Sequence, residues 1–255
     1  MIVPAMPMLS AVPQAPDHAA VCAERGRWAL AGLPSIAPGL LVPEGRRAVV
    51  VTPNPDDEVA SLGGLIHGLH FLGRPLTIIA ATGEAGGASS HNPPEYDGEA
   101  QVQYAPYSGA LHRLGVTSRA ETDAALCRVM HAGMEKGALH RNETALAAFL
   151  AWRLKPGDVL FASWRFDGDP DHEAVGRAAL AAAAIVGAKC IPVPVHAWDW
   201  AMPGDTRIPW HRARRIDVDQ YGLYAKRKAL SGDGVPGDPR LDGPSARQPY
   251  EIVLL

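Results

Sequence analysis

The chain alternates between short apolar runs and longer segments with helical periodicity. Apolar runs of the kind found in buried parallel strands occur at 47–52, 75–81, 158–163 and 190–198. Helical patterns follow at 59–72, 107–114, 143–154 and from His172 onward. Strands that alternate with helices predict an α/β fold, in which a Rossmann-like, mostly parallel sheet is flanked by helices.

One domain accounts for most of the chain. A sequence of 255 residues is long enough to bury a single large α/β core. Residues 1–44 are rich in Pro and Ala and carry one helix-like stretch at 18–30. We therefore expect residues 1–44 to form an N-terminal extension packed on a domain that spans residues 45–255.

Two local features interrupt this regular pattern. Gly63 and Gly64 lie inside the helix predicted at 59–72, where glycine costs helix stability, so they predict a close approach of the backbone to another part of the chain. The segment 82–99 is polar, Gly-rich and unusually long for a loop in a compact domain. Loops of this length are usually either functional or mobile, and a lid is one role that it could have.

Composition and charge exclude several classes of function. Hydrophobic residues make up 47% of the chain and the formal net charge is -3, which offers no electrostatic footprint for nucleic acid. No apolar run reaches the length of a membrane span, and the N-terminus lacks the basic region of a secretory signal. We expect a cytoplasmic protein that acts on a small molecule, without a nucleic-acid or membrane partner. A homo-oligomer is compatible with the sequence.

The three cysteines carry no recognisable chemistry. Cys22, Cys127 and Cys190 are scattered and have no CxxC spacing. They predict neither a disulfide framework nor a thiolate zinc site, and each is better interpreted as a small packed residue.

Two acidic turns each follow a predicted strand and precede a predicted helix. The first is PNPDDE at 53–58, and the second, within 166–172, contains Asp167, Asp169, Asp171 and His172. The carboxyl ends of parallel strands meet at one edge of the sheet, so both turns should reach the same site. Acids at helix starts can be simple caps, but two such clusters at one edge favour a counter-ion, most simply a divalent metal.

Both turns carry a resemblance to a known family. PNPDDEVASLGGLI resembles the signature of the LmbE-like family, also called PIG-L deacetylases, which reads PHPDDE followed by a small-residue helix ending in GGLI. SWRFDGDPDHEAVGRAALAAA resembles the family's second motif, DGHPDHRAVG. LHRLGV at 111–116 and RIPWHRARRIDV at 207–218 are also similar to the family, so the resemblance covers roughly residues 45–230.

The resemblance implies a site and an activity. Characterised members of the family are mostly zinc-dependent hydrolases of N-acetyl groups on glucosamine-containing molecules. Carried over by position, Asp57 and His172 would be metal ligands, and Asn54 occupies the position of the third. Asp56 would be the general base that takes a proton from water, and Asp171 would orient the catalytic groups. The implied substrate is a sugar-like small molecule with an N-acyl bond.

This sequence departs from the family pattern at two positions. Asn54 replaces the His of PHPDDE, and an amide oxygen is a weaker metal donor than imidazole. Asp169 replaces the first His of HPDH, which in the family polarises the acyl oxygen. An ionised carboxylate there would oppose a developing oxyanion. We still include Asp169 among the candidate catalytic residues, with Asp56 and Asp171.

Three hypotheses follow from these departures. The protein is a metal-dependent amidase with altered ligation, in which Mg²⁺, Mn²⁺ or Ca²⁺ replaces zinc. Alternatively, it has lost its metal and deacetylase activity and binds a small ligand. In the third, Asp56 and Asp169 form an acid/base pair for a different reaction.

Other residues suggest how the site could be completed. His91 and His196 lie where they could reach the sheet edge and replace the missing ligand. Trp198 and Trp200 would lie on one face of an extended segment and could stack on a sugar ring, although core packing is the simpler explanation. RARR at 212–215 could hold an anionic group or form a solvated basic surface.

Overall fold

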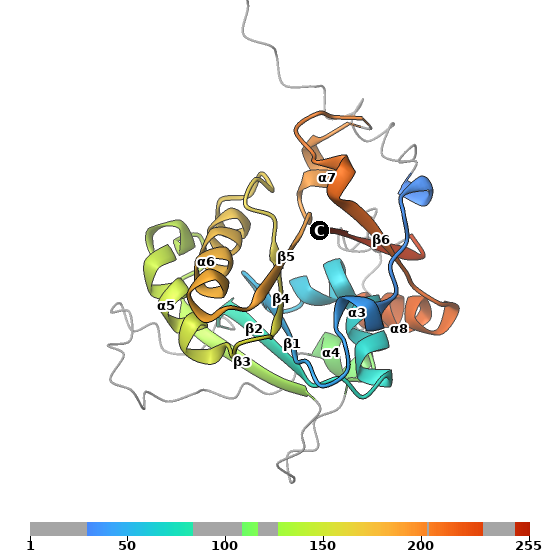
Figure 1. The fold of residues 1–255 in the computed structure, drawn as a ribbon, viewed down its shortest axis with the longest axis horizontal. Coiled ribbons are helices and arrows are strands. Elements are labelled where there is room, and N and C mark those ends of the chain that lie inside the picture. Colours follow the sequence, from blue (N-terminus) through green and yellow to red (C-terminus); the bar gives the residue numbers. More distant parts are fainter. Residues whose placement is uncertain (1–29, 84–108, 117–126, 203, 232–247) are drawn as a thin grey trace, which may run out of the picture.

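A five-stranded parallel sheet forms the centre of the protein. The computed structural model describes residues 30–83, 109–116, 127–202, 204–231 and 248–255. The strands are β1 (Ala48–Thr52), β2 (Leu76–Thr82), β3 (Cys127–Met134), β4 (Val159–Ser163) and β5 (Lys189–Val193). Their order is β3-β2-β1-β4-β5, and every neighbouring pair is parallel (Figure 1). The predicted α/β class and the mostly parallel sheet are therefore confirmed.

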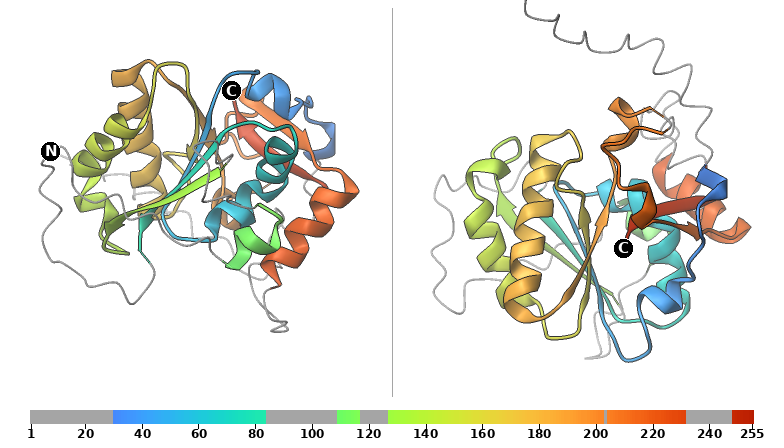
Figure 2. Two further views of the ribbon diagram at one scale, coloured as in Figure 1. Left: turned by 90° about the horizontal axis from the view of Figure 1, so that it is seen from below. Right: turned by 45° about the horizontal axis from the view of Figure 1, so that its top comes forward.

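Helices cover both faces of the sheet. One layer holds α3 (Asp57–Phe71), α4 (Gly109–Arg113) and α8 (Gln220–Leu230), and the other holds α5 (Glu143–Arg153) and α6 (Pro170–Val186) (Figures 1 and 2). Side chains alternate along β1: Val50 packs in the core on the α3 side, whereas Val49 and Val51 pack in the core on the α5–α6 side. This two-sided burial explains why the strands are continuous apolar runs in the sequence.

A smaller antiparallel pair completes the described architecture. It consists of β6 (Ala213–Asp217) and β7 (Tyr250–Leu254), which the sequence analysis did not predict. RARR at 212–215 therefore lies largely within a strand. The remaining short elements are α2 (Pro38–Leu41), α7 (Ala197–Trp200) and 3-10 turns at Leu30–Gly32, Leu139–Arg141 and Trp210–Arg212. None of the helices in the described ranges is long and apolar enough to cross a membrane.

Two expectations about strands were wrong. The strand expected at 190–198 ends at Val193, and Ala197–Trp200 is helical, because the N–H groups of residues 195–197 donate to the Asp167 carboxylate instead of to a strand. The edge strand β3 was missed altogether. Its sequence, CRVMHAGM, mixes polar and small residues and has no β-branched run, so it does not show the pattern of a buried strand.

The predicted helices agree closely with the observed ones where both can be compared. Helix α6 begins at Pro170, two residues before the expected start, because Asp169 caps it. The helix-like stretch at 18–30 and the loop at 82–99 lie almost entirely outside the described residues. Of the proposed extension, Leu41 and Val42 are buried in the same core as α3, and the domain boundary at residue 45 stays a prediction.

A buried ion pair locks α3 against the C-terminal part of the chain. The helix is interrupted at Leu62, where the backbone angles are non-helical. The freed N–H groups of Gly64 and Leu65 donate to the two carboxylate oxygens of Glu251, each at 2.8 Å. Glu251 also binds the ammonium of Lys226 at 2.6 Å, and both side chains are fully buried.

The two glycines of α3 make this arrangement sterically possible. A Cβ at Gly63 would lie 3.1 Å from Cγ of Lys226, and a Cβ at Gly64 would clash with the side chain of Val218. The close backbone approach predicted from Gly63 and Gly64 is confirmed.

We expect Glu251→Gln to destabilise the fold by about 3–5 kcal/mol, because Lys226 would remain buried without its anion. The free energy of unfolding in urea measures the effect. Asp217→Asn, which breaks the ion pair between Arg215 and the exposed Asp217 on the same small sheet, should change the free energy of unfolding by less than about 1 kcal/mol. Equal effects of the two substitutions would contradict the proposed importance of the buried pair.

Candidate active site

The two acidic turns lie side by side at the carboxyl edge of the sheet. β1 and β4 are parallel neighbours, so the turns that follow them emerge at the same edge. Oδ2 of Asp57, at the start of α3, lies 3.6 Å from Nε2 of His172, at the start of α6. The shared site expected from the sequence thus corresponds to a real juxtaposition of the two motifs.

Asn54 is hydrogen-bonded to Asp57. Its Nδ2 donates to Asp57 Oδ2 at 3.0 Å, and its backbone N–H donates to the same oxygen at 3.2 Å. Its Oδ1 accepts from the hydroxyl of Thr82, at the end of β2, at 3.3 Å. Asn54 therefore connects the end of β2 to the carboxylate that faces His172.

Asp56 adopts a backbone conformation that non-glycine residues rarely use. Its φ is 75°, the only positive value among non-glycine residues in the described ranges. It occupies the N-cap position of α3, but its side chain makes no capping hydrogen bond. Such strain typically persists where function requires a particular placement of the side chain. Capping does not explain this carboxylate, which favours a chemical role for Asp56.

The imidazole of His172 is fixed by two groups that the sequence analysis did not assign. Its Nδ1 lies 3.0 Å from the hydroxyl of Ser163, the last residue of β4, and 3.6 Å from Oδ2 of Asp167. The ring is 3% exposed. Ser163 could have been suspected only because it ends a strand next to the second motif.

Asp167 organises the backbone that follows β5. Its fully buried carboxylate accepts hydrogen bonds from the N–H groups of Val195, His196 and Ala197 at 2.8–3.1 Å. Burial raises the pKa of Asp167, and the three N–H donors and His172 oppose that shift. A single buried acid thus joins the second motif to the start of α7.

The other two acids of the second motif are engaged with backbone groups. Oδ1 of Asp169 caps α6 by accepting from the N–H groups of Asp171 and His172 at 2.9 and 3.0 Å. The Asp171 carboxylate accepts from the N–H groups of Gly137 and Leu139 at 2.6 and 3.1 Å. Both acids therefore help to place His172 through the first turn of α6.

His196 lies against His172. The two ring centroids are 4.4 Å apart in an edge-to-face arrangement. Nδ1 of His196 lies 3.1 Å from Oδ2 of Asp199, and this hydrogen bond raises the pKa of His196. Burial opposes the increase in pKa, and the nearby acids add to it. His91, the other histidine considered as a replacement ligand, lies outside the described residues.

Asp57 and Glu58, adjacent acids of the first turn, do not share the same charge state. Burial opposes ionisation of Asp57, but the contacts with His172 and Asn54 outweigh it and lower the pKa of Asp57. Burial raises the pKa of Glu58 to about 8, and the neighbouring Asp56 and Asp57 add to the shift. Glu58 is therefore mostly protonated at pH 7, which relieves the repulsion in this turn.

The side chains of Asn54, Asp57 and His172 form the donor set that a cation would meet. Within the described ranges, no group of three or more His, Cys, Asp or Glu side chains is arranged to hold a metal. Asp57 Oδ2 and His172 Nε2 are 3.6 Å apart, a separation compatible with two atoms bound to one cation.

The amide of Asn54 can serve as the third donor if it is reversed. As oriented, its Nδ2 faces Asp57. Reversal would turn Oδ1 toward Asp57 and Nδ2 toward Thr82. The hydroxyl proton of Thr82 would then go to Pro53 O alone, and the hydroxyl oxygen would accept from Nδ2. The residues therefore fit a divalent cation, with an amide oxygen as a weak ligand.

The tryptophans expected to form one sugar-stacking face do not do so. The segment is helical, so residues two apart point in different directions. Trp198 is buried and donates to Pro194 O, whereas Trp200 is half-buried and donates to Asp167 O at 2.7 Å. The idea of a shared face was wrong because β5 ends before these residues.

These features define a parallel α/β protein with a polar site where β1 and β4 end. The family model for PIG-L, the GlcNAc-PI de-N-acetylases, matches residues 49–183, more than half of the chain. The protein belongs to this family. A comparison with curated protein sequences finds no significant match.

Solved structures resemble the fold at low sequence identity. A deacetylase of the teicoplanin biosynthesis pathway is 15% identical with a TM-score of 0.50, and the match covers 82% of this chain and 96% of that one. The N,N'-diacetylchitobiose deacetylase of Pyrococcus horikoshii is 16% identical with a TM-score of 0.42, covering 78% and 74%. The 4-carboxy-2-hydroxymuconate hydratase GalB of Pseudomonas putida KT2440 is 16% identical with a TM-score of 0.47, covering 82% and 94%.

We expect Glu58→Gln to change how stability depends on pH. The folded pKa of Glu58 is raised above its unfolded value, so its stabilising contribution is present below about pH 4.5 and is lost as the pH rises toward 8. Relative to the wild type, Glu58→Gln should gain stability between pH 5 and pH 8, on the order of 1 kcal/mol per pH unit. Urea unfolding across this range measures the difference. The exposed Glu44→Gln serves as the control, and a difference that is constant with pH would contradict the assignment.

Proposed function

We propose that the protein is a hydrolase that removes an acyl group from the nitrogen of a sugar-like small molecule. The observation that carries the proposal is the 3.6 Å approach of Asp57 and His172, which come from two family motifs, at one sheet edge. The sugar-like character of the substrate rests on membership of the family. The roles of Asn54, Asp56, Asp57 and His172 are supported by the geometry of the described residues.

Asn54, Asp57 and His172 are the residues that would hold a divalent cation. A cation bound there would supply Lewis-acid stabilisation of charge on the acyl oxygen and would make a water molecule more acidic. An oxygen-rich donor set favours Mg²⁺ or Mn²⁺ more than the usual zinc site does. Asp57, with its lowered pKa, remains the anionic member of this set at neutral pH.

Asp56 is the proposed general base. Its strained backbone presents a carboxylate next to Asp57 that the helix does not use for capping. Such a carboxylate can take a proton from the attacking water and transfer it to the leaving nitrogen. Ser163 and Asp167 hold the His172 ring in a fixed orientation during these steps.

His196 is the proposed replacement for the imidazole lost at position 169. Asp169 is engaged in capping α6, which disfavours an acid/base pair of Asp56 and Asp169. His196 lies against His172, and its raised pKa favours the cationic form that can stabilise charge on an acyl oxygen.

A second candidate function is ligand binding without hydrolysis. The Asn54 amide donates directly to the carboxylate oxygen that faces His172, so the cluster is hydrogen-bonded without any cation. A protein that uses the pocket only for binding would need no more than this arrangement.

We expect Asp56→Asn to lower kcat by about 10²–10⁴-fold, because the amide cannot take a proton from water. Release of free amine from a panel of N-acetylated amino sugars, with Mn²⁺, Mg²⁺ or Zn²⁺ present, measures the activity. The exposed Asp217→Asn should retain wild-type activity. If the wild type is active and Asp56→Asn has the same kcat, the role of Asp56 as general base is contradicted.

Asn54→His should raise zinc affinity at least about tenfold, because imidazole is a better zinc donor than an amide. Isothermal titration calorimetry measures this directly. Asp57→Asn in the same background should abolish the gain. If the wild type releases no amine and only the double variant Asn54→His/Asp169→His does, the binding function is favoured instead.

A further inference from the structure

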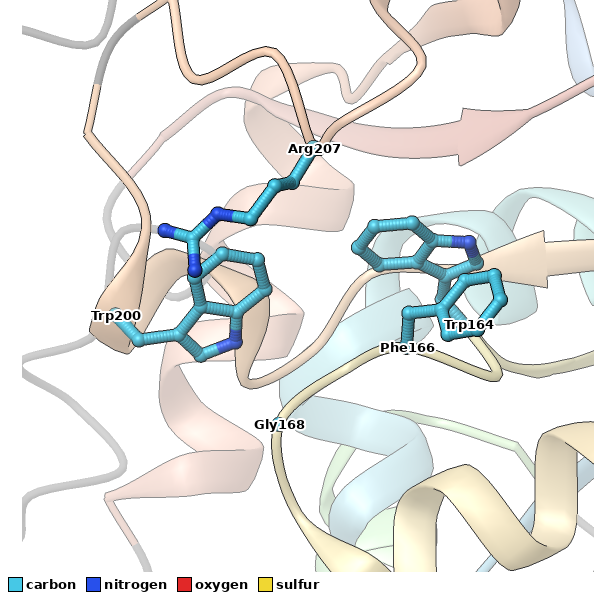
Figure 3. Close-up of a pocket in the computed structure, with 5 residues that line it drawn as sticks. All are labelled: Trp164, Phe166, Gly168, Trp200 and Arg207. Atoms are coloured by element: carbon cyan, nitrogen blue, oxygen red, sulfur yellow. The ribbon is translucent and has the colours of Figure 1, made fainter. Parts of the chain in front are cut away.

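A pocket with aromatic walls lies beside the second acidic turn. It has a volume of about 580 Å³ and is lined by Trp164, Phe166, Gly168, Trp200 and Arg207 (Figure 3). Gly168 lies between Asp167 and Asp169, so the pocket shares its turn with the proposed active site. We call these five residues the aromatic slot.

One wall of the slot comes from the segment after β4. Trp164 follows Ser163 directly and is buried, whereas Phe166 is 55% exposed. Their rings meet edge to face with centroids 5.7 Å apart. An exposed aromatic ring beside a proposed active site is apolar surface that a ligand could cover.

The opposite wall is Trp200, which is fixed to the acidic turn. Its Nε1 donates to the backbone oxygen of Asp167 at 2.7 Å. Gly168 makes this contact possible, because its φ is 97° and a Cβ there would clash with the indole of Trp200. Trp200 is therefore positioned by the same turn that orients His172.

Arg207 stacks on Trp200 with its charge already balanced. Its guanidinium carbon lies 4.3 Å from the ring centroid of Trp200. Its Nε donates to both carboxylate oxygens of Asp205, at 3.0 and 3.1 Å. Arg207 thus presents a flat, weakly hydrated face instead of an unpaired cation.

The lining favours one class of ligand. Trp164 and Phe166 lie on one side of the slot and Trp200 with Arg207 on the other, as Figure 3 shows. Among the five lining residues, the groups that can bond along an edge are the guanidinium of Arg207 and the indole N–H of Trp164. Neither can accept a hydrogen bond, so the several hydroxyl groups of a sugar ring would lose water without adequate replacement. A flat aromatic ring has no such requirement and gains by stacking.

We propose that the aromatic slot binds an aryl group of the substrate. This aryl group is attached to the sugar-like part, whose N-acyl bond lies at Asp56 and His172. The position given to the N-acyl bond rests on the proposed function. The aryl site itself rests on the slot.

Paired probes test this proposal. Phenyl and cyclohexyl 2-acetamido-2-deoxyglucosides share the sugar and the acetamide and differ in whether the attached ring is flat and aromatic. We expect the phenyl glucoside to bind the wild type at least about tenfold more tightly by calorimetry. Phe166→Ala and Trp200→Ala should remove this preference, and Trp200→Phe, which keeps a ring, should retain part of it.

The chain offers matched control residues outside the slot. Phe71 is an exposed phenylalanine on α3, and Trp152 is an exposed tryptophan on α5 with Arg153 stacked on it at 3.9 Å. Phe71→Ala and Trp152→Ala should leave the preference for the phenyl glucoside unchanged. Loss of the preference in these variants would overturn the assignment.

Four further outcomes test the slot, and the last two separate it from the hydrolase. Equal affinity for both glucosides, or tighter binding of an N-acetylglucosamine disaccharide than of the phenyl glucoside, would overturn the aryl site. Aryl preference that depends on Phe166 and Trp200 without any amine release would support the slot and contradict the hydrolase. Amine release without aryl preference would support the hydrolase and contradict the slot.

Discussion

The site depends on the hydrogen bonds made by the buried carboxylate of Asp167. It accepts three N–H groups from residues 195–197 and lies 3.6 Å from the imidazole of His172. Because charged hydrogen bonds of this kind are strong and a buried acid without them would be costly, the chain after β5 cannot continue as a strand. This carboxylate sets the start of α7 and, together with Ser163, orients His172, while the backbone oxygen of the same residue fixes Trp200.

The first acidic turn shows how a cluster of like charges can persist inside a protein. Asp57 is kept ionised by its contacts with Asn54 and His172, while Glu58 is buried and mostly protonated at neutral pH. Burial and different contact partners therefore give different charge states to two residues that look equivalent in the sequence. Asn54 takes part directly, since its amide binds the carboxylate that faces His172 and is held by Thr82.

Much of the fold could be predicted because local patterns and burial agree in this chain. Strands β1, β2 and β4 are buried on both faces and therefore appear as uninterrupted apolar runs, and α6 carries its cap in the motif itself. The edge strand β3 and the end of β5 were not predicted correctly. β3 is defined by its pairing with β2, and the end of β5 is set by the side chain of Asp167, about 30 residues away. Local sequence patterns contain neither of these contacts.

The sequence by itself determined the α/β class, the family and the two motifs that meet at the sheet edge, because periodicity and motif spacing are local properties of the chain. Only the tertiary structure decided which groups surround those motifs. It assigned Asp167 and Ser163 to His172, placed His196 beside that ring and built the aromatic slot from segments around 164 and 200. Such contacts depend on packing between distant segments and on burial, which also raises the pKa of Glu58.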